Sequence, residues 1–325
     1  MPNILIVGAT GYIGKALSQS LIRSGNHRVF GLARSQEKAR SLAQEEVIPI
    51  LGSISPESSS SLISAINIHH IDTIVDVSGA AHGSLDLLNL VKGIGKLRLE
   101  EAKSSGEMVP KLGFIYCSGT WVHGSSHVPV NDLMPVGTPN APAPPAELVA
   151  WRTKVEKNVL AARDVLDVMI IRPALVYGRS CAIWMSFFEP LYEAVQSQSL
   201  PDTVRVPADE ASRPGLVHVD DVASGFHAAI EKLNIIAGTG VYPVFDLQTS
   251  QESMNDILRA AARELGFKGN LELVGAGEDL FAKAMCANGS CSSGRAKSLL
   301  GWAPKREGFV EGMGVFVKAW ESSRA

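Results

Sequence analysis

The chain has 325 residues, 46% of them apolar, and a formal net charge of −3 at pH 7. A chain of this length and composition can bury one large hydrophobic core or two smaller ones. The slight acidic balance and the absence of a run of lysines and arginines give no attraction for nucleic acid or for a membrane surface.

Two further properties of the sequence limit where the protein works and how it is held together. No stretch approaches the roughly 18 apolar residues of a membrane span, and no export signal stands at the N-terminus. We therefore expect a soluble, cytoplasmic protein. The four cysteines, Cys117, Cys181, Cys286 and Cys291, are too few and too unevenly spaced for a disulfide framework or a zinc site, so we expect free thiols and no metal.

The first fourteen residues carry the clearest motif. Residues 3–7 are mostly β-branched or apolar, which predicts a strand buried on both faces, and glycines follow at positions 8, 11 and 14. Gly8 permits a tight turn, Gly11 lets the backbone approach a pyrophosphate, and Gly14 lets the next helix pack close to the strand. Backbone amides at the start of that helix then face the anion. The motif predicts a dinucleotide-binding turn made of Gly8, Thr10, Gly11, Tyr12, Ile13 and Gly14.

A second strand, predicted over residues 28–33, leads to Arg34 and Ser35, about twenty residues beyond the last glycine. An acidic residue at this point would accept hydrogen bonds from the ribose hydroxyls of NAD. A cation and a hydroxyl, with Lys38 and Arg40 close behind, suit the 2′-phosphate of NADP instead. The alternative is that this basic segment is only the solvated start of a helix. The sequence favours NADP(H) over NAD(H) as the cofactor.

Strands and helices alternate along the next part of the chain. Strands are predicted over residues 47–51, 71–77, 111–116 and 168–171, and helices over 56–66, 85–104 and 146–165. This alternation predicts right-handed βαβ crossovers and a parallel sheet. The fourth strand ends in Ser78, Gly79 and Ala80, whose small side chains leave room for the cofactor at the carboxyl edge of the sheet.

The alternation ends after the sixth strand. Residues 183–198 are predicted to form an aromatic helix that suits the lining of an apolar pocket, although such a stripe is also typical of a plain core. A helix beginning within residues 213–223 and running to residue 230 is predicted next. A strand over 244–247, a helix over 253–265, a strand over 271–274 and a last helix follow.

These motifs resemble the extended short-chain dehydrogenase/reductases of the NAD-dependent epimerase/dehydratase kind. The resemblance covers nearly the whole chain and rests on residues 8–14, 114–124, 154, 172–178, 217–223 and 300–304. It implies an α/β fold in which a doubly wound parallel-sheet Rossmann domain, residues 1–178 with 214–248, carries the cofactor. A smaller C-terminal substrate-binding region, residues 179–213 with 249–325, completes it. Further cofactor contacts are implied at Lys154, Pro173, Ala174 and Val176.

The resemblance also shows where the chain departs from the family. Family chemistry uses a tyrosine four residues before a lysine, whose charge lowers the phenol pKa from about 10, and a hydroxyl at the end of the fifth strand. Lys154 matches the lysine, but Ala150 occupies the tyrosine position. Ser118 remains in the fifth-strand motif, Gly119 takes the position of the reacting hydroxyl, and His123 replaces a tyrosine.

The candidate catalytic residues are therefore Ser118, Thr120, His123 and Lys154. Lys154 can hold the ribose, and hydride transfer mainly requires that the nicotinamide meets an electrophilic carbon. A proton can come from Ser118 or Thr120 relaying water, from Tyr177, or from His123, whose reference pKa of about 6.5 suits transfer in either direction. The alternative for His123 is that it only replaces a packed tyrosine.

Three functions fit these residues. The first is an atypical NADPH-dependent oxidoreductase that reduces a small apolar carbonyl, imine or conjugated compound. The second is a catalytically silent NADP(H) sensor, suggested by Ala150, and the third is a non-redox isomerase or cyclase that uses the same pocket. Sugar-nucleotide epimerisation ranks lower because it normally needs the missing tyrosine. We expect a small-molecule substrate and a monomer or homodimer.

Overall fold

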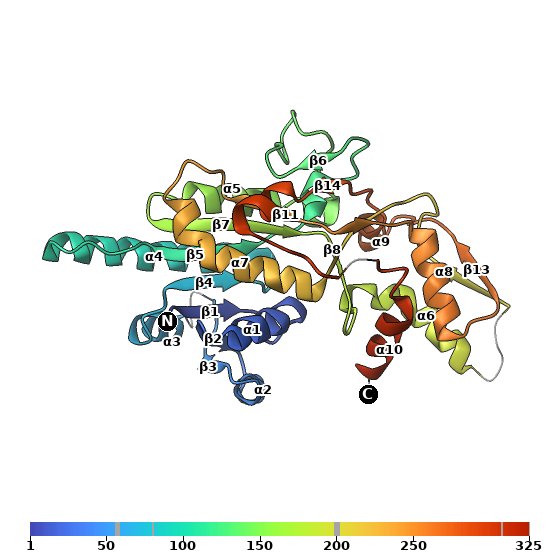
Figure 1. The fold of residues 1–325 in the computed structure, drawn as a ribbon, viewed down its shortest axis with the longest axis horizontal. Helices are drawn as coiled ribbons and strands as arrows, with labels where there is room; N and C mark the ends of the chain where they lie inside the picture. Colours follow the sequence, from blue (N-terminus) through green and yellow to red (C-terminus); the bar gives the residue numbers. More distant parts are fainter. Residues whose placement is uncertain (56–58, 80, 198–201, 307, 325) are drawn as a thin grey trace.

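The computed structural model describes residues 1–55, 59–79, 81–197, 202–306 and 308–324. Among these residues, seven parallel strands form a central sheet in the order β11-β7-β5-β4-β1-β2-β3 (Figure 1). The strands are β1 (Asn3–Val7), β2 (Arg28–Ala33), β3 (Ile48–Leu51), β4 (Thr73–Asp76), β5 (Leu112–Cys117), β7 (Leu166–Pro173) and β11 (Val244–Leu247). The predicted doubly wound Rossmann fold is confirmed.

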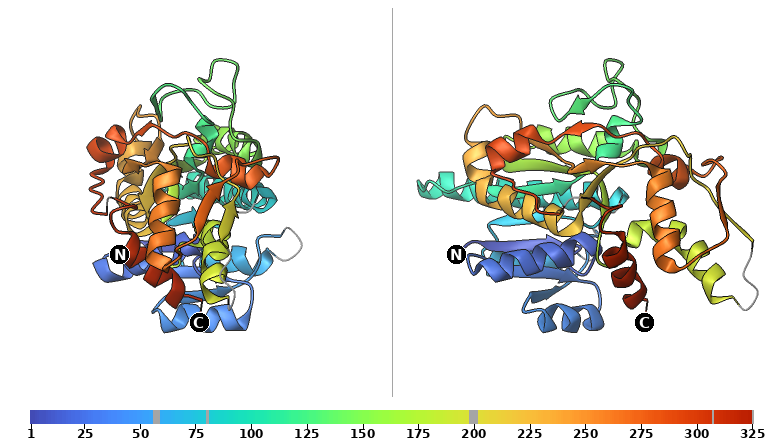
Figure 2. Two further views of the ribbon diagram at one scale, coloured as in Figure 1. Left: turned by 90° about the vertical axis from the view of Figure 1, so that its right-hand side faces the viewer. Right: turned by 45° about the vertical axis from the view of Figure 1, so that its right-hand side comes forward.

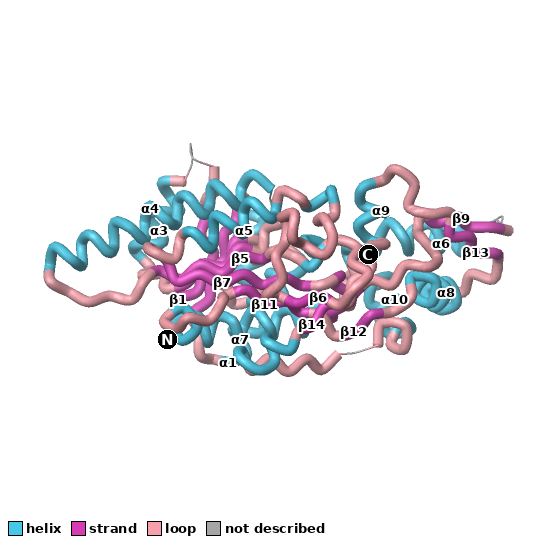
Figure 3. The backbone as a smooth tube through the Cα atoms, turned by 90° about the horizontal axis from the view of Figure 1, so that it is seen from above, coloured by secondary structure: helices cyan, strands magenta, loops and turns pink. Residues whose placement is uncertain are grey.

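Helices cover both faces of this sheet, as the view from above shows (Figure 3). They are α1 (Tyr12–Ser24), α2 (Gln36–Gln44), α3 (Ser60–Ile68), α4 (Ala81–Ser105), α5 (Arg152–Ala161) and α7 (Val219–Ala237). Ile4 and Ile6 pack toward α1 and α7, whereas Leu5 and Val7 pack toward α3, α4 and α5. Alternate residues of one strand therefore serve two separate cores, because side chains of a strand point to opposite faces.

The chain after β7 also builds a smaller part with its own hydrophobic core, at the right of Figure 1 and in the right-hand view of Figure 2. Its elements are β8 (Leu175–Tyr177), α6 (Met185–Gln196), β9 (Thr203–Val206), β10 (Gly215–His218), β12 (Ser250–Gln251), α8 (Met254–Leu265), β13 (Asn270–Leu273), α9 (Leu280–Met285) and α10 (Met313–Ser322). Trp184, Phe187 and Phe188 are fully buried here. These three side chains are therefore part of the core, whereas Tyr192 of the same segment is half-buried.

Two predicted helices differ from the structure. Residues 146–165 contain a short 3-10 helix (Glu147–Val149) and then α5, which begins only at Arg152. Ala146 donates its backbone N–H to the Trp121 carbonyl, which ties the start of this segment to the loop after β5.

Residues 215–218 form strand β10 before α7 begins, because Leu216 pairs with Leu175 of β8. That partner is about forty residues distant, so local sequence gives no sign of it.

Short elements complete the chain. A proline-rich loop (residues 129–145) contains β6 (Val130–Asn131), which pairs with β14 (Cys291–Ser292). A π-helix spans Ala296–Leu300. All four cysteines are free, and burial raises the pKa of Cys117 and Cys181 to about 12, so both thiols stay protonated. Among the described helices, none combines the length and the apolar character that a bilayer crossing requires.

Candidate functional site

The turn between β1 and α1 has the geometry that its glycines predict. Gly8 has a φ of +94°, and the Gly11 N–H donates to the Gly8 carbonyl at 2.9 Å. A Cβ at Gly14 would lie 2.0 Å from that carbonyl oxygen, and a Cβ at Gly8 would lie 2.9 Å from the backbone of Ser78. Gly11 caps α1 without a side-chain hydrogen bond. The first amides of the helix are therefore left for an anion, as a pyrophosphate site requires.

The other residues of the turn lie beside these amides. Thr10 and Ile13 are half-buried. Tyr12 donates its hydroxyl to the Gly178 carbonyl at 2.5 Å, and burial raises the pKa of this phenol well above its ordinary value. This contact fastens the glycine turn to the segment that follows β8.

Arg34 and Ser35 stand at the end of β2, which lies next to β1 in the sheet. Both residues are exposed. The Ser35 hydroxyl accepts the Lys38 backbone N–H at 3.3 Å and so caps α2. Arg34 extends into solvent at the same edge of the sheet as the glycine turn.

The end of β4 carries an acidic residue that the sequence analysis missed. Ser78 donates its backbone N–H and its hydroxyl to Asp76 Oδ1, at 3.0 and 2.6 Å. Asp76 Oδ2 is buried and has no hydrogen-bond partner among the described residues. Gly79 is exposed with a φ of +67°. Ala80, the third residue expected here, lies outside the described residues.

The end of β5 repeats this pattern. Tyr116 is the register neighbour of Asp76, and its hydroxyl is likewise buried without a partner within the described chain. Burial raises the pKa of Tyr116. Ser118 donates its backbone N–H to the Ile171 carbonyl at 2.8 Å, but its hydroxyl has no described partner. We call Asp76, Tyr116 and Ser118 the open polar cluster. Buried polar atoms are normally paired, so this cluster marks a place for a ligand or water.

Arg152 is a second residue that the sequence analysis missed. Its Nη1 atom donates to the Cys117 carbonyl at 3.4 Å and lies 3.6 Å from where a Cβ of Gly119 would stand. Its Nε atom is buried with no partner among the described groups. A guanidinium therefore lies beside the position that Gly119 leaves without a side chain. The sequence offered one sign of this residue, because it places a cationic side chain two positions before Lys154.

The remaining predicted residues lie on the segments that follow β5 and β7. Lys154 and Ala150 are exposed, on α5 and just before it, and Thr120 is half-buried in a 3-10 helix (Thr120–His123). The carbonyl of Pro173 lies 3.5 Å from the Cβ position of Gly119. The two other predicted cofactor contacts after β7, Ala174 and Val176, are buried.

His123 lies in a different environment. Its Nε2 atom is 2.9 Å from Asp246 Oδ2, and Arg172 lies 3.6 Å from the other oxygen of that carboxylate. Arg172 also pairs with Glu156 at 2.6 and 2.9 Å. Burial alone would lower the pKa of Arg172, but the two carboxylates raise it above its ordinary value. We call Glu156, Arg172, Asp246 and His123 the ion network. All four side chains are buried, and each has an ion-pair or hydrogen-bond partner. Two of their atoms, His123 Nδ1 and Asp246 Oδ1, make no hydrogen bond among the described residues.

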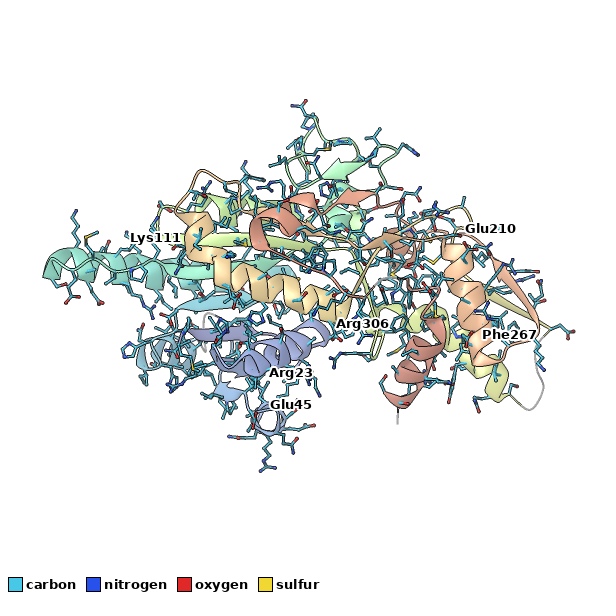
Figure 4. All side chains as sticks on the ribbon, in the orientation of Figure 1. Arg23, Glu45, Lys111, Glu210, Phe267 and Arg306 are labelled. Carbon is cyan, nitrogen blue, oxygen red and sulfur yellow. The ribbon has the colours of Figure 1, made fainter. Side chains whose placement is uncertain are left out.

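Two hollows lie outside these clusters. A groove of about 1270 Å³ runs along the amino ends of β1, β4 and β5, the opposite edge of the sheet from the glycine turn. Lys111 lines it and is labelled at the left of Figure 4, far from Arg306, which binds the start of α7. A pocket of about 250 Å³ lies between the proline-rich loop and α9. Ligands of open α/β sheets bind at the carboxyl edge, so the groove is not the predicted cofactor site.

Comparison with known proteins identifies the family. The sequence profile of the "NAD dependent epimerase/dehydratase family" matches residues 4–244. The chain belongs to this family. A curated relative is the sterol-4-alpha-carboxylate 3-dehydrogenase (decarboxylating) of Dictyostelium discoideum, 26% identical over 194 residues. The match covers 55% of this chain and 54% of the relative, so the chain spans about half the length of that enzyme.

Solved structures of nucleotide-sugar enzymes share the fold of this family member. The dTDP-glucose 4,6-dehydratase of Bacillus anthracis in complex with NAD is 17% identical, with a TM-score of 0.68 over 99% of this chain and 97% of that one. The UDP-glucuronic acid 4-epimerase of Bacillus cereus in complex with UDP-glucuronic acid and NAD has the same identity and TM-score, over 99% of both chains. At this identity the likeness establishes the fold alone.

Proposed function

We propose that this protein is an oxidoreductase that binds NADP(H) and reduces a small apolar carbonyl, imine or conjugated compound. The glycine turn carries the proposal. A backbone that excludes a Cβ at Gly8 and Gly14 and leaves the amides of α1 uncapped fits the pyrophosphate of a dinucleotide. Ser78 and Gly79 border the path of the dinucleotide from this turn toward Lys154.

The choice of NADP(H) rests on Arg34. Its exposed guanidinium follows β2, where an acidic side chain would favour NAD, and Lys38 adds a second cation on α2. Two similar solved structures contain NAD, so cofactor choice needs its own test. We expect Arg34→Asp to weaken NADPH binding at least about tenfold more than NADH binding, because only NADPH loses a charge-assisted contact. Equal losses for the two cofactors would exclude this role of Arg34.

Other residues of this chain take over part of the role of the missing tyrosine, which is to stabilise and protonate the reacting heteroatom. A nicotinamide held by the glycine turn and Lys154 would supply the hydride for the carbon of the substrate double bond. Arg152 then stabilises the negative charge that develops on the substrate heteroatom, beside Gly119. Ser118, with Thr120 next to it, orients that atom and relays a proton from water. Lys154 holds the ribose.

Neither alternative proton source is free for this task. His123 directs Nε2 at Asp246 inside the ion network, and the Tyr177 hydroxyl donates to the Arg306 carbonyl at 3.3 Å. We assign both residues to holding the fold. His123→Phe is then expected to leave the pH profile of turnover unchanged in protein that remains folded.

Apolar surface next to Ser118 and Thr120 supports an apolar substrate. Trp121 and Phe281 of α9 are half-buried and meet edge to face, with ring centroids 6.4 Å apart. Phe281 belongs to residues 249–325, which we assign with residues 179–213 to the substrate-binding region. The curated relative is named for a sterol carboxylate, a largely apolar substrate, which agrees with this choice.

Binding and turnover together test the proposal. NADPH fluorescence is titrated with the full chain, and a panel of apolar ketones, imines and conjugated enones is then screened for loss of NADPH absorbance. We expect binding, and turnover that falls at least about tenfold in Arg152→Met and Ser118→Ala, consistent with loss of one stabilising group. Product formed without NADPH consumption would favour an isomerase or cyclase.

One observation keeps a second function in view. Ala150 is exposed on the segment that leads to Lys154 and has no phenol that could donate a proton. The chain can therefore bind NADP(H) without oxidising or reducing it. A silent sensor of this kind predicts tight NADPH binding with no turnover on any panel compound. Turnover that depends on Arg152 would exclude the sensor.

A further inference from the structure

Three metal-ligating side chains converge outside the site described above. A ring nitrogen of His27, a ring nitrogen of His227 and a carboxylate oxygen of Glu231 lie within 4.8 Å of one another. His227 Nε2 is 3.4 Å from Glu231 Oε1, and the two imidazole rings meet nearly at right angles with centroids 5.3 Å apart. His27 precedes β2, whereas His227 and Glu231 stand one turn apart on α7. The cluster therefore joins two elements of the fold.

Serines of α1 hold the two rings. Ser24 donates its hydroxyl to the Leu21 carbonyl at 2.6 Å, so toward His27 Nδ1, 3.4 Å away, it acts as an acceptor. His27 then carries its proton on Nδ1 and a lone pair on Nε2. Ser20, one turn earlier, lies 2.9 Å from His227 Nδ1. Metal-binding histidines are oriented in this way, by a hydrogen bond from the ring nitrogen that does not bind the ion.

We propose that His27, His227 and Glu231 bind one divalent transition-metal ion of the zinc type. Two imidazoles and a carboxylate are ligands that zinc accepts, and tetrahedral bonds of about 2.1 Å place ligand atoms about 3.4 Å apart. The separation of His227 Nε2 and Glu231 Oε1 already has this value. The side chain of Glu231 is 46% exposed, and His27 and Glu231 line the groove at the amino edge of the sheet. Water and the ion can enter from there.

A second cluster is less suited to an ion. His123, Asp246 and Cys291 also offer ligand atoms within 4.8 Å of one another. However, the Arg172 guanidinium lies 3.5 Å from His123 Nε2, and burial raises the pKa of the Cys291 thiol. An ion there would displace a buried cation and require a thiolate that the surroundings disfavour. No lysine or arginine side chain hydrogen-bonds or ion-pairs with His27, His227 or Glu231 among the described residues. The N-terminal ammonium lowers the pKa of His27, but less than burial and His227 do.

Binding of the ion is expected to stabilise the fold. The ion would fasten the end of α1 and the start of β2 to α7, at the end of α1 opposite the glycine turn. This role does not depend on the proposed reductase activity, because the cluster and the glycine turn lie at opposite edges of the sheet. Either the metal site or the reductase activity can therefore be refuted while the other stands.

Zinc titration of the metal-stripped full chain, freed of any purification tag, tests the site. Calorimetry with zinc chloride is expected to give one site per chain. Zinc at a hundredfold excess over its Kd should raise Tm by about 5 °C, because the ion binds only the folded chain. His227→Ala and Glu231→Gln should each weaken zinc binding at least tenfold. His127→Ala, at an exposed histidine elsewhere, should leave it unchanged.

Two controls keep the result interpretable. The metal-free variants should melt close to the metal-free parent chain, which separates loss of a ligand from loss of the fold. Cobalt in place of zinc should give no thiolate charge-transfer band, and Cys291→Ser should bind zinc normally. Absence of a zinc-dependent rise in Tm, or His227→Ala that binds zinc as well as the parent chain, would overturn the proposal. Zinc binding lost only in Cys291→Ser would overturn it too.

Discussion

Two groups of buried polar side chains follow neighbouring strands of one sheet, yet they differ in how they are satisfied. In the ion network, Arg172 of β7 and Asp246 of β11 pair with each other and with Glu156 and His123. Asp246 Oδ1 of this network makes no hydrogen bond among the described residues, but the Arg172 guanidinium lies 3.6 Å from it. In the open polar cluster, at the ends of β4 and β5, the free oxygens have neither a hydrogen bond nor an ion pair among the described residues. A paired buried charge holds the fold, whereas an unpaired polar atom costs stability and is expected where a ligand binds.

Breaking the ion network gives the largest expected effect. Arg172→Met leaves Glu156 and Asp246 buried without their cation, so the free energy of unfolding should fall by about 3–5 kcal/mol. Arg205→Met is the matched control, because Arg205 and Glu272 form an ion pair on the surface. Urea denaturation should detect a loss below about 1 kcal/mol for that variant. Similar losses in the two variants would show that burial does not distinguish these pairs.

Gly14 tests the glycine turn, where we expect the cofactor to bind. A methyl group there would lie 2.0 Å from the Gly8 carbonyl oxygen, so Gly14→Ala must displace the turn. We expect NADPH affinity to fall at least tenfold, about 1.4 kcal/mol, in fluorescence titration. Gly93→Ala, in α4 where a Cβ meets nothing, is the control and should bind NADPH normally. Normal binding by Gly14→Ala would remove the turn from the cofactor site.

His218 is a buried polar side chain whose hydrogen bond forms only when the ring is neutral. Its Nδ1 atom accepts the Asp220 N–H at 3.1 Å and caps α7, and burial lowers its pKa to about 4. The unfolded ring takes up a proton below about pH 6.5, so stability is lost as the pH falls from 6.5 toward 4. Urea denaturation at pH 7 and 5.5 should differ by about 1 kcal/mol more in the parent chain than in His218→Asn, which keeps the cap. Equal pH dependence would contradict this assignment.

The smallest effect is expected in the open polar cluster. Tyr116→Phe removes a hydroxyl that has no described partner, so the free energy of unfolding should stay constant or rise by up to about 1 kcal/mol. Chemical denaturation without cofactor measures this change. A loss above 1 kcal/mol would mean that the hydroxyl already has a partner in the folded chain.

Local sequence was enough for the parts of the molecule whose geometry is local. The glycine spacing and the apolar run before it predicted β1, the turn and the start of α1, because each depends on a few adjacent residues. The strand β10 was missed because its pairing with β8 joins distant segments. Asp76 and Arg152 were missed for the same reason: only the folded sheet brings them beside Tyr116 and Gly119. The sequence also could not reveal that Asp246 lies against His123.

We propose that a reducing dinucleotide, bound at the glycine turn, reacts with an apolar substrate beside Arg152 and Ser118. The most direct measurement is single-turnover oxidation of bound NADPH by an apolar ketone or enone, in the parent chain and in Arg152→Met. We expect NADPH oxidation matched by reduced product, and a rate at least about tenfold lower in the variant. Failure to bind NADPH, or a variant that reacts as fast as the parent chain, would contradict it.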